Sequence, residues 1–209
     1  MKLQTKVCGM RHADNISEVA ALRPNWLGFI FYPSSQRYVG EDFVMPPLPP
    51  EVARVGVFVG QPYGDIQRLV TRHNLQAVQL HGAESPDQAT DVKALGVTVI
   101  KAFSVHDHFN FEEVKPYHNR VDYFLFDTRG KTPGGTGMQF NWDLLENYDQ
   151  QTPFFLSGGL GLNELDQLHR LAGMNLAGVD LNSRLEDSPG LKNPEAVRSA
   201  LVKISNLTI

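Results

Sequence analysis

One thiol and one carboxylate occupy positions from which they could transfer protons. Cys8 ends a short apolar segment at residues 5–8, and Asp127 directly follows another at residues 122–126. A thiolate can take a proton from carbon and a carboxylic acid can supply one, so the pair suits general acid–base catalysis without a metal ion or organic cofactor. Each residue also has a structural interpretation. A free cysteine is commonly a small buried side chain, and an aspartate after a strand often caps a turn.

Glycine-rich segments follow the sixth and seventh apolar segments, and Asn182-Ser183 follows the eighth, in a pattern that suits a phosphate group. Glycine lets the backbone approach an anion closely, and backbone N–H groups donate hydrogen bonds to phosphate oxygens. Ordinary turns are the alternative interpretation of any one of these segments. Three such loops together favour a phosphate site. The candidate phosphate-binding residues are Gly134, Gly135, Gly137, Gly158, Gly159 and Ser183.

The triplet Gly130-Lys131-Thr132 looks like the end of a nucleotide-binding P-loop, but its spacing excludes one. A P-loop has a further glycine five residues before the glycine that precedes the lysine, and Leu125 stands there. The neighbouring glycines also come after the lysine, where a P-loop would already be helical. We therefore expect no ATP site at this segment.

Two further polar features could bind a ligand. Arg37 follows the second apolar segment, and its guanidinium could hold a carboxylate through two hydrogen bonds. A solvated surface arginine is the alternative. His106 and His108 stand two residues apart, but the sequence offers no identifiable third ligand, so we expect no metal site.

Eight short apolar segments must position these side chains. They are nearly continuous in hydrophobicity, as expected for parallel strands buried on both faces, and helical segments with caps at Asn15, Ser85, Asn163 and Asn193 separate several of them. The pattern predicts an α/β fold, a single (β/α)8 TIM barrel of eight parallel strands with some short helices. An open doubly wound sheet is the alternative. The predicted strands are residues 5–8, 26–31, 54–59, 77–80, 97–103, 122–126, 153–156 and 177–181.

The barrel hypothesis also gathers the candidate residues. Active sites of such barrels lie where the strands end, on the loops that lead into the helices. The first and sixth strands lie roughly opposite each other across the mouth of a closed barrel. Cys8 and Asp127 could therefore act as base and acid on a substrate held between them.

Composition limits the class of protein. The chain has 209 residues, a formal net charge of −4 with both signs dispersed, and one cysteine. We expect one domain over residues 1–209, no nucleic-acid partner and no membrane association, since no apolar run approaches the ~18 residues of a membrane span. A single cysteine and the lack of an apolar leader favour the cytoplasm. Nothing in the sequence distinguishes a monomer from a homodimer.

Several motifs, taken together and in this order, resemble the phosphoribosylanthranilate isomerase family. They run from residue 6 towards the last predicted helix, so the resemblance covers essentially the whole chain. The two most specific segments are KVCGM and the long stretch ending in Arg37-Tyr38. The motifs are residues 6–10 (KVCGM), 28–38 (GFIFYPSSQRY), 78–82 (VQLHG), Asp127 with 134–137 (GGTG), and 156–160 (LSGGL).

The resemblance implies an Amadori rearrangement in tryptophan biosynthesis, with a phosphorylated small-molecule substrate and no cofactor. It implies that Asp127 is the general acid, that Cys8 is the general base, and that Arg37 holds the anthranilate carboxylate. The glycine loops would hold the phosphate. Surroundings that lower the pKa of the Cys8 thiol would suit it to its role, since a free thiol titrates at ~8.5. Gln79, His81 and Asp180 would line the pocket.

One departure and several rivals remain. The family usually has a Ser-Gly pair after the eighth strand, whereas this chain reads Ser183-Arg184. Arginine would be strained there if the turn requires positive φ, and otherwise could add a cation near the phosphate. Related barrel enzymes would need a lysine–glutamate set, a second aspartate in place of Cys8, or convergent metal ligands. A non-catalytic sensor of phosphate ligands on the same scaffold is the alternative from another class.

Overall fold

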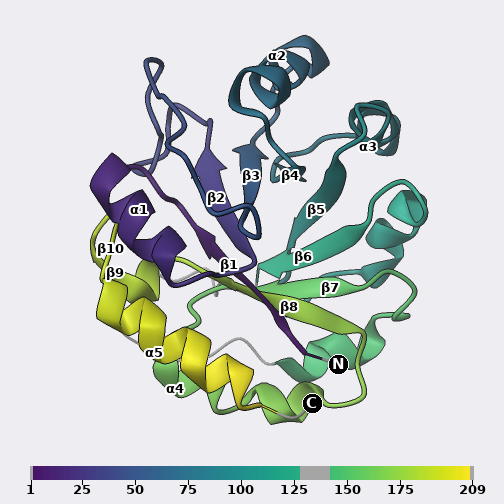
Figure 1. Cartoon of the computed structure of the whole chain (residues 1–209). Coiled ribbons are helices and arrows are strands. Elements are labelled where there is room, and N and C mark those ends of the chain that lie inside the picture. Colours follow the sequence, from purple (N-terminus) through teal and green to yellow (C-terminus); the bar gives the residue numbers. More distant parts are fainter. Residues whose placement is uncertain (1, 128–141, 208–209) are drawn as a thin grey trace.

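The chain forms a closed barrel of eight parallel strands in the computed structural model, which describes residues 2–127 and 142–207. The strands are hydrogen-bonded in chain order, and β8 closes the barrel against β1 (Figure 1). The strands are β1 (Gln4–Cys8), β2 (Trp26–Ile30), β3 (Ala53–Phe58), β4 (Ala77–Leu80), β5 (Thr98–Ser104), β6 (Tyr123–Asp127), β7 (Phe154–Ser157) and β8 (Leu176–Leu181).

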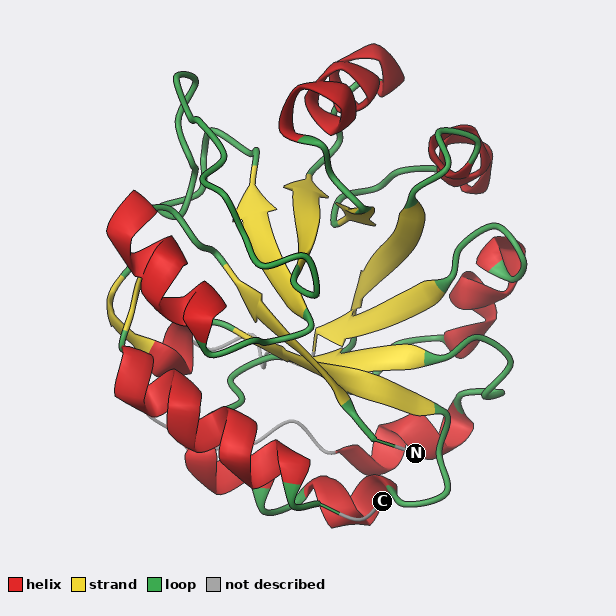
Figure 2. Cartoon of the chain, in the orientation of Figure 1, coloured by secondary structure: helices red, strands yellow, loops and turns green. Residues whose placement is uncertain are grey.

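The predicted TIM barrel is confirmed. Every predicted strand is present with its ends within one residue of the prediction. The open doubly wound sheet is wrong, because Gln4 to Val7 of β1 pair in parallel with Gly178 to Leu181 of β8 and leave no free edge. Helices surround the strands on the outside of the barrel (Figure 2). Burial on both faces explains why the strands are almost continuously apolar.

The outer layer consists of short helices. Some are 3₁₀ helices of three to seven residues, so the helical layer is thin where they replace longer helices. The α-helices are α1 (Ala13–Ala21), α2 (Tyr63–His73), α3 (Pro86–Lys93), α4 (Leu162–Leu165) and α5 (Pro194–Ser205). The 3₁₀ helices are η1 (Phe111–Tyr117), η2 (Trp142–Asn147), η3 (Leu168–Leu171) and η4 (Ser183–Leu185).

Two of the four predicted helix caps are confirmed. The side chains of Ser85 and Asn193 each accept a hydrogen bond from the backbone N–H three residues later, at 3.2 and 3.0 Å. The cap at Asn163 is wrong, because α4 begins one residue earlier and Gly161 is its N-cap. The cap at Asn15 is also wrong, because α1 begins at Ala13.

Asn15 instead anchors an unpredicted hairpin. Its side-chain Nδ2 donates to the backbone oxygen of Lys192 at 2.8 Å, and the Lys192 N–H donates to Asn15 Oδ1 at 2.8 Å. Lys192 belongs to an antiparallel pair of strands, β9 (Glu186–Ser188) and β10 (Leu191–Lys192), which follows β8. A buried asparagine on the first helix thus fixes a hairpin near the other end of the chain.

The barrel interior contains an apolar cluster separate from the larger core beneath the helices. Successive strand side chains point alternately inward and outward, so each strand contributes to both. The interior cluster consists of Val55, Ala77, Ile100, Ala102, Leu125 and Phe155. Trp26 and Tyr123 pack against it, with Trp26 edge-on to Phe155. Because Trp26, Ala77 and Tyr123 are first residues of their strands, this cluster fills the amino-terminal part of the barrel.

Among residues 2–127 and 142–207, no helix combines the length and the apolar character that crossing a membrane requires. The longest α-helix is α5, with 12 residues. A helix needs about 20 apolar residues to span the hydrocarbon core of a bilayer.

Candidate active site

A polar layer lies towards the carboxyl ends of the strands, beyond the interior apolar cluster. It contains Lys6 and Cys8 of β1, Gln79 of β4, Asp127 of β6 and Asp180 of β8. Lys6, Cys8, Gln79 and Asp180 are all buried, and Asp127 is 17% exposed. The alternation of side chains along each strand places these polar groups on the barrel axis. The barrel therefore brings together residues from positions 6 to 180 of the chain.

Lys6 and Asp180 form a buried ion pair at the base of this layer. The two residues are register partners on β1 and β8, and Lys6 Nζ lies 2.9 Å from Asp180 Oδ1. Burial by itself lowers the pKa of Lys6, but the charges of Asp180 and Cys8 outweigh it and the pKa is raised. Lys6 is therefore a fixed ammonium inside the barrel, and Asp180 lies beside it in the polar layer.

Cys8 shares a small space with Lys6 because Gly28 stands opposite it. Cys8 and Gly28 are register partners on β1 and β2. A Cβ atom on Gly28 would lie 2.8 Å from Cys8 Sγ and 3.1 Å from Lys6 Nζ, so only glycine leaves room for both groups. Burial raises the pKa of the Cys8 thiol, and Lys6 opposes that effect. Burial outweighs the lysine, so the surroundings of Cys8 do not supply the lowered pKa that would suit a base.

Gln79, His81 and Asp127 form a second group across the mouth. Gln79 Nε2 lies 2.6 Å from His81 Nδ1, and His81 Nε2 lies 3.8 Å from Asp127 Oδ2. Burial, together with the charge of Lys6, lowers the pKa of His81 to about 4. The imidazole is thus neutral at neutral pH. If Gln79 donates to Nδ1, the ring proton sits on Nε2 and faces Asp127.

A neutral His81 suits an acid at Asp127. A protonated imidazole at this distance would favour the charged form of a neighbouring carboxyl group. The neutral ring does not do so, and it still offers an N–H towards the Asp127 carboxyl group. The neutral ring therefore places no positive charge beside the Asp127 carboxyl group.

Arg37 is held by an acidic residue that the sequence-based interpretation missed. Its Nε donates to both carboxylate oxygens of Glu186, at 2.8 and 3.0 Å, and its Nη2 donates at 2.5 Å. Lys192 Nζ donates to Glu186 as well. Burial opposes the ionisation of Glu186, but the hydrogen bonds from Arg37 and Lys192 outweigh it and lower the pKa of this carboxyl group. The three charged groups form one network.

This network places the guanidinium group over the loop that follows Cys8. Gly9 adopts φ of 78°, and a Cβ atom there would lie 2.7 Å from Arg37 Cδ and 2.8 Å from Asn182 Oδ1. Lys192 Nζ also donates to Asn182 at 2.9 Å. Glu186 occupies the Nε–Nη2 edge of the guanidinium, so a bound carboxylate would take the edge formed by Nη1 and the second N–H of Nη2.

We expect Glu186→Gln to weaken substrate binding more than turnover. The neutral amide lacks the carboxylate charge and one of the two acceptor oxygens that Arg37 uses, so Arg37 is held less firmly in its orientation. KM should rise about tenfold, equivalent to ~1.4 kcal/mol, while kcat stays within a few-fold of the wild-type value. Steady-state kinetics measures both constants.

The matched control for this change is Asp87→Asn, which breaks an exposed ion pair with Arg120 elsewhere on the molecule. It should leave KM unchanged. An unchanged KM in Glu186→Gln, with the fold intact by circular dichroism, would contradict a role for Glu186 in presenting Arg37.

The predicted phosphate residues fall into two groups. Gly134, Gly135 and Gly137 lie outside the described residues. Gly158 and Gly159 follow β7 with φ of 103° and 68°, so this turn requires glycine. Ser183, another of the predicted phosphate-binding residues, begins η4 after β8.

Arg184 occupies η4 without strain. Among the described residues, those with positive φ other than glycine are Arg23, Asn74, Asn119 and Gln150, so Arg184 is not one of them. A Cβ atom on Gly161 would lie 3.3 Å from Arg184 Cβ. The exposed Arg184 side chain thus begins beside the loop that follows β7. The possibility that arginine is strained here by a positive φ is therefore excluded.

A buried pair, Glu84 and Lys101, braces the loops on the other side of the mouth. Glu84 Oε1 accepts hydrogen bonds from the N–H groups of Gly60 and Gly82 at 2.7 and 3.1 Å, and Lys101 Nζ lies 3.2 Å from Oε2. Lys101 also donates to the Gly82 carbonyl at 2.7 Å. The pair therefore holds the ends of β3 and β4 next to His81. In the sequence, the one indication of this buried pair was Lys101, a lysine inside the otherwise apolar segment of β5.

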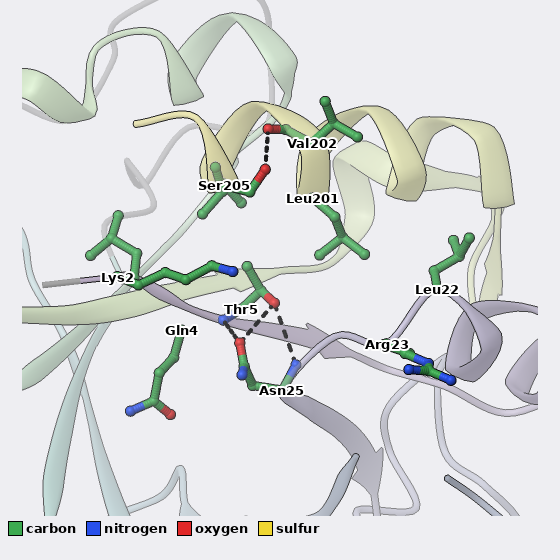
Figure 3. A pocket seen from close by; sticks show the side chains of 11 residues that line it. Lys2, Gln4, Thr5, Leu22, Arg23, Asn25, Leu201, Val202 and Ser205 are labelled. Atoms are coloured by element: carbon green, nitrogen blue, oxygen red, sulfur yellow. Dashed lines mark hydrogen bonds between the residues drawn. The ribbon is translucent and has the colours of Figure 1, made fainter. Parts of the chain in front are cut away.

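A separate pocket of about 460 Å³ lies at the opposite end of β1 (Figure 3). Lys2, Thr5 and Asn25 line it together with side chains from the end of α5. Asn25 Oδ1 accepts hydrogen bonds from the N–H and hydroxyl groups of Thr5, at 2.8 and 3.2 Å. These polar groups satisfy one another, and they lie at the amino-terminal end of the strand that carries Cys8 at its carboxyl end. The pocket is not part of the candidate active site.

Comparison with known proteins identifies the family of this chain. The family model described as N-(5'phosphoribosyl)anthranilate (PRA) isomerase matches residues 5–203. The chain belongs to the phosphoribosylanthranilate isomerase family. A relative named N-(5'-phosphoribosyl)anthranilate isomerase, from Phocaeicola vulgatus, is 42% identical over 194 residues, which cover 93% of this chain and 94% of the relative.

Solved structures of phosphoribosylanthranilate isomerases share the fold. The enzyme from Thermotoga maritima superimposes with a TM-score of 0.84 at 29% identity, covering 98% of this chain and 100% of that one. A phosphoribosylanthranilate isomerase in complex with reduced 1-(o-carboxyphenylamino)-1-deoxyribulose 5-phosphate gives a TM-score of 0.81 at 27% identity, with the same coverage. All residues of the polar layer lie within the region that the isomerase family model matches.

Proposed function

We propose that this protein is an N-(5'-phosphoribosyl)anthranilate isomerase of tryptophan biosynthesis. It converts an aminoaldose phosphate into 1-(2-carboxyphenylamino)-1-deoxyribulose 5-phosphate. The observation that carries the proposal is the polar layer of a family barrel in which a thiol, Cys8, and a carboxyl group, Asp127, stand at the ends of β1 and β6. A structurally similar isomerase binds a reduced form of this product.

In the first step, Asp127 acts as the general acid. It donates its proton to the furanose ring oxygen of the substrate, and the bond between this oxygen and C1′ breaks. The lone pair of the anthranilate nitrogen forms a double bond to C1′, which gives a protonated Schiff base. The neutral ring of His81, with its Nε2 3.8 Å from Asp127 Oδ2, adds no positive charge that would oppose a protonated carboxyl group.

In the second step, the Cys8 thiolate acts as the general base. It takes the proton from C2′, the electrons form a double bond between C1′ and C2′, and the positively charged nitrogen becomes neutral. The resulting enolamine loses its C2′ hydroxyl proton and gains one at C1′, which yields the ketone. Both steps move protons between the substrate and side chains of this chain, as general acid–base catalysis requires.

Substrate binding follows from the charges around the mouth. Arg37, fixed by Glu186, would hold the anthranilate carboxylate through its free Nη1–Nη2 edge. Gly158, Gly159 and Ser183 would donate backbone N–H groups to the phosphate, together with glycines 134, 135 and 137 of the predicted loop. Arg184 could add a cation beside them.

The location and assembly of the enzyme remain predictions. A cytoplasmic location is expected from its single cysteine. The chain acts as a monomer or a homodimer, and light scattering distinguishes the two. Monomers have been generated from the dimeric Thermotoga maritima relative, so both forms occur on this fold.

The direct test is turnover of phosphoribosylanthranilate by the purified protein in the presence of a metal chelator. Loss of substrate fluorescence reports the reaction. We expect turnover that the chelator does not reduce. A folded protein that binds a reduced product analogue without consuming substrate would instead support the alternative, a sensor of phosphate ligands.

A further inference from the structure

The Cys8 thiol lies in an environment that opposes its role as a base. Its side chain is 3% exposed, and burial disfavours the charged thiolate. A thiol that cannot ionise cannot take a proton from carbon. Something near Cys8 must therefore stabilise the negative charge if Cys8 is the base.

The charged groups around Cys8 come from several elements. Lys6 lies two residues earlier on β1, Asp180 faces it from β8, Lys192 approaches from β10 and Arg37 from the loop after β2. Asp180 disfavours the thiolate, whereas Lys6 and Lys192 favour it. The Arg37 and Lys192 charges are both tied to Glu186, which offsets them.

Lys6 lies close enough to the thiol to influence its charge. Its Nζ and Cys8 Sγ both lie within 3.1 Å of the point where a Cβ atom on Gly28 would stand. The ammonium is completely buried, and its one hydrogen bond to an acidic oxygen among the described residues, to Asp180 Oδ1 at 2.9 Å, holds it in place. An ammonium has three donors, so two remain after this bond.

We propose that Lys6, held by Asp180, is a positioning residue that pairs with the thiolate of Cys8 and keeps it available as the base. The thiol releases its proton to solvent, the thiolate then takes the carbon-bound proton of the substrate, and Lys6 keeps its three protons throughout. Asp180 holds the lysine in place, although its own negative charge disfavours the thiolate. This inference rests on the proposed function of Cys8 as the general base.

The test uses the fact that Cys8 is the only cysteine of the chain. The ultraviolet absorbance of a thiolate, followed against pH, reports the ionisation of this one thiol without any substrate. We expect Asp180→Asn to shift the thiol titration to lower pH. We expect the double variant Lys6→Met, Asp180→Asn to shift it to higher pH than the wild type by about one unit, a tenfold change in the thiolate fraction below the inflection.

The double variant removes both charges of the buried pair, since Lys6→Met alone leaves Asp180 unpaired and is more prone to unfold. Lys203→Met is the control, because it removes one positive charge from an ion pair with Asp166 far from the polar layer. It should not move the titration. The acid limb of the pH profile of kcat/KM should move in step with the thiol in each active variant.

Coincident thiol titrations for Asp180→Asn and the double variant would overturn the proposal, since they would show that Lys6 does not act on Cys8. The proposed role of Cys8 as the general base fails separately, if Cys8→Ser retains full activity while the titrations of the cysteine-containing variants still shift as expected. Circular dichroism confirms that each variant is folded before its titration is interpreted.

Discussion

Cys8→Ser lowers kcat of the isomerase by about 10²–10⁴, the usual contribution of one general acid or base. A serine hydroxyl ionises far less readily than a thiol, so the variant cannot take the C2′ proton at neutral pH. The two side chains are nearly the same size, and Gly28 leaves the space beside them unchanged. Substrate binding should therefore persist, and KM should change only a few-fold. Steady-state kinetics at several pH values measures both constants.

The control for Cys8→Ser is the affinity for a reduced product analogue. Retained affinity with lost turnover separates the chemical step from binding. Near wild-type kcat in a folded Cys8→Ser protein would show that another group removes the proton, and the mechanism proposed above would then be wrong.

Asp127→Asn lowers kcat/KM by a similar factor, about 10²–10⁴, because an amide cannot deliver the proton that opens the furanose ring. Asparagine keeps the shape of the side chain and an acceptor oxygen that can face His81 Nε2, so the fold should be preserved. The loss should not be recovered at low pH, where the wild-type acid is fully protonated. Substrate consumption measured across pH tests this directly.

Asp122→Asn provides a matched control just before the same strand. Asp122 accepts a hydrogen bond from the Val99 N–H at 2.8 Å and pairs with Lys93, at the amino-terminal end of β6. The same chemical change there should leave kcat/KM within a few-fold of the wild type. Equal losses in both variants would point to a structural effect along β6 rather than to loss of an acid.

Local sequence patterns were sufficient for the barrel. Strand segments are set by near-continuous hydrophobicity over four to seven residues, which any window of the sequence displays. The caps at Ser85 and Asn193 precede proline at the first helical position, which makes the start of each helix unambiguous. Asn15 lacks that signal, and its side chain bonds to Lys192 instead. The local sequence does not distinguish an asparagine that caps a helix from one that makes a buried tertiary contact.

The candidate site was only partly accessible from the sequence. Cys8 and Asp127 were predicted because they stand at strand ends that form the mouth of the barrel, whereas Asp180 was predicted only from the family resemblance. Arg37 was found as a cation but not as a partner of Glu186, which lies 149 positions away. The raised pKa of Cys8 could not be predicted from the sequence, since burial depends on the packing of the whole barrel.

The sequence by itself determined the strands, the family and the side chains that can transfer protons. Those properties depend on residue type and on spacing along a few neighbouring positions. The tertiary structure decided the ionic partners: Lys6 meets Asp180, 174 residues away, only because β8 closes the barrel against β1. Charge states in the site follow from such contacts and from burial, and both arise only when distant segments pack together.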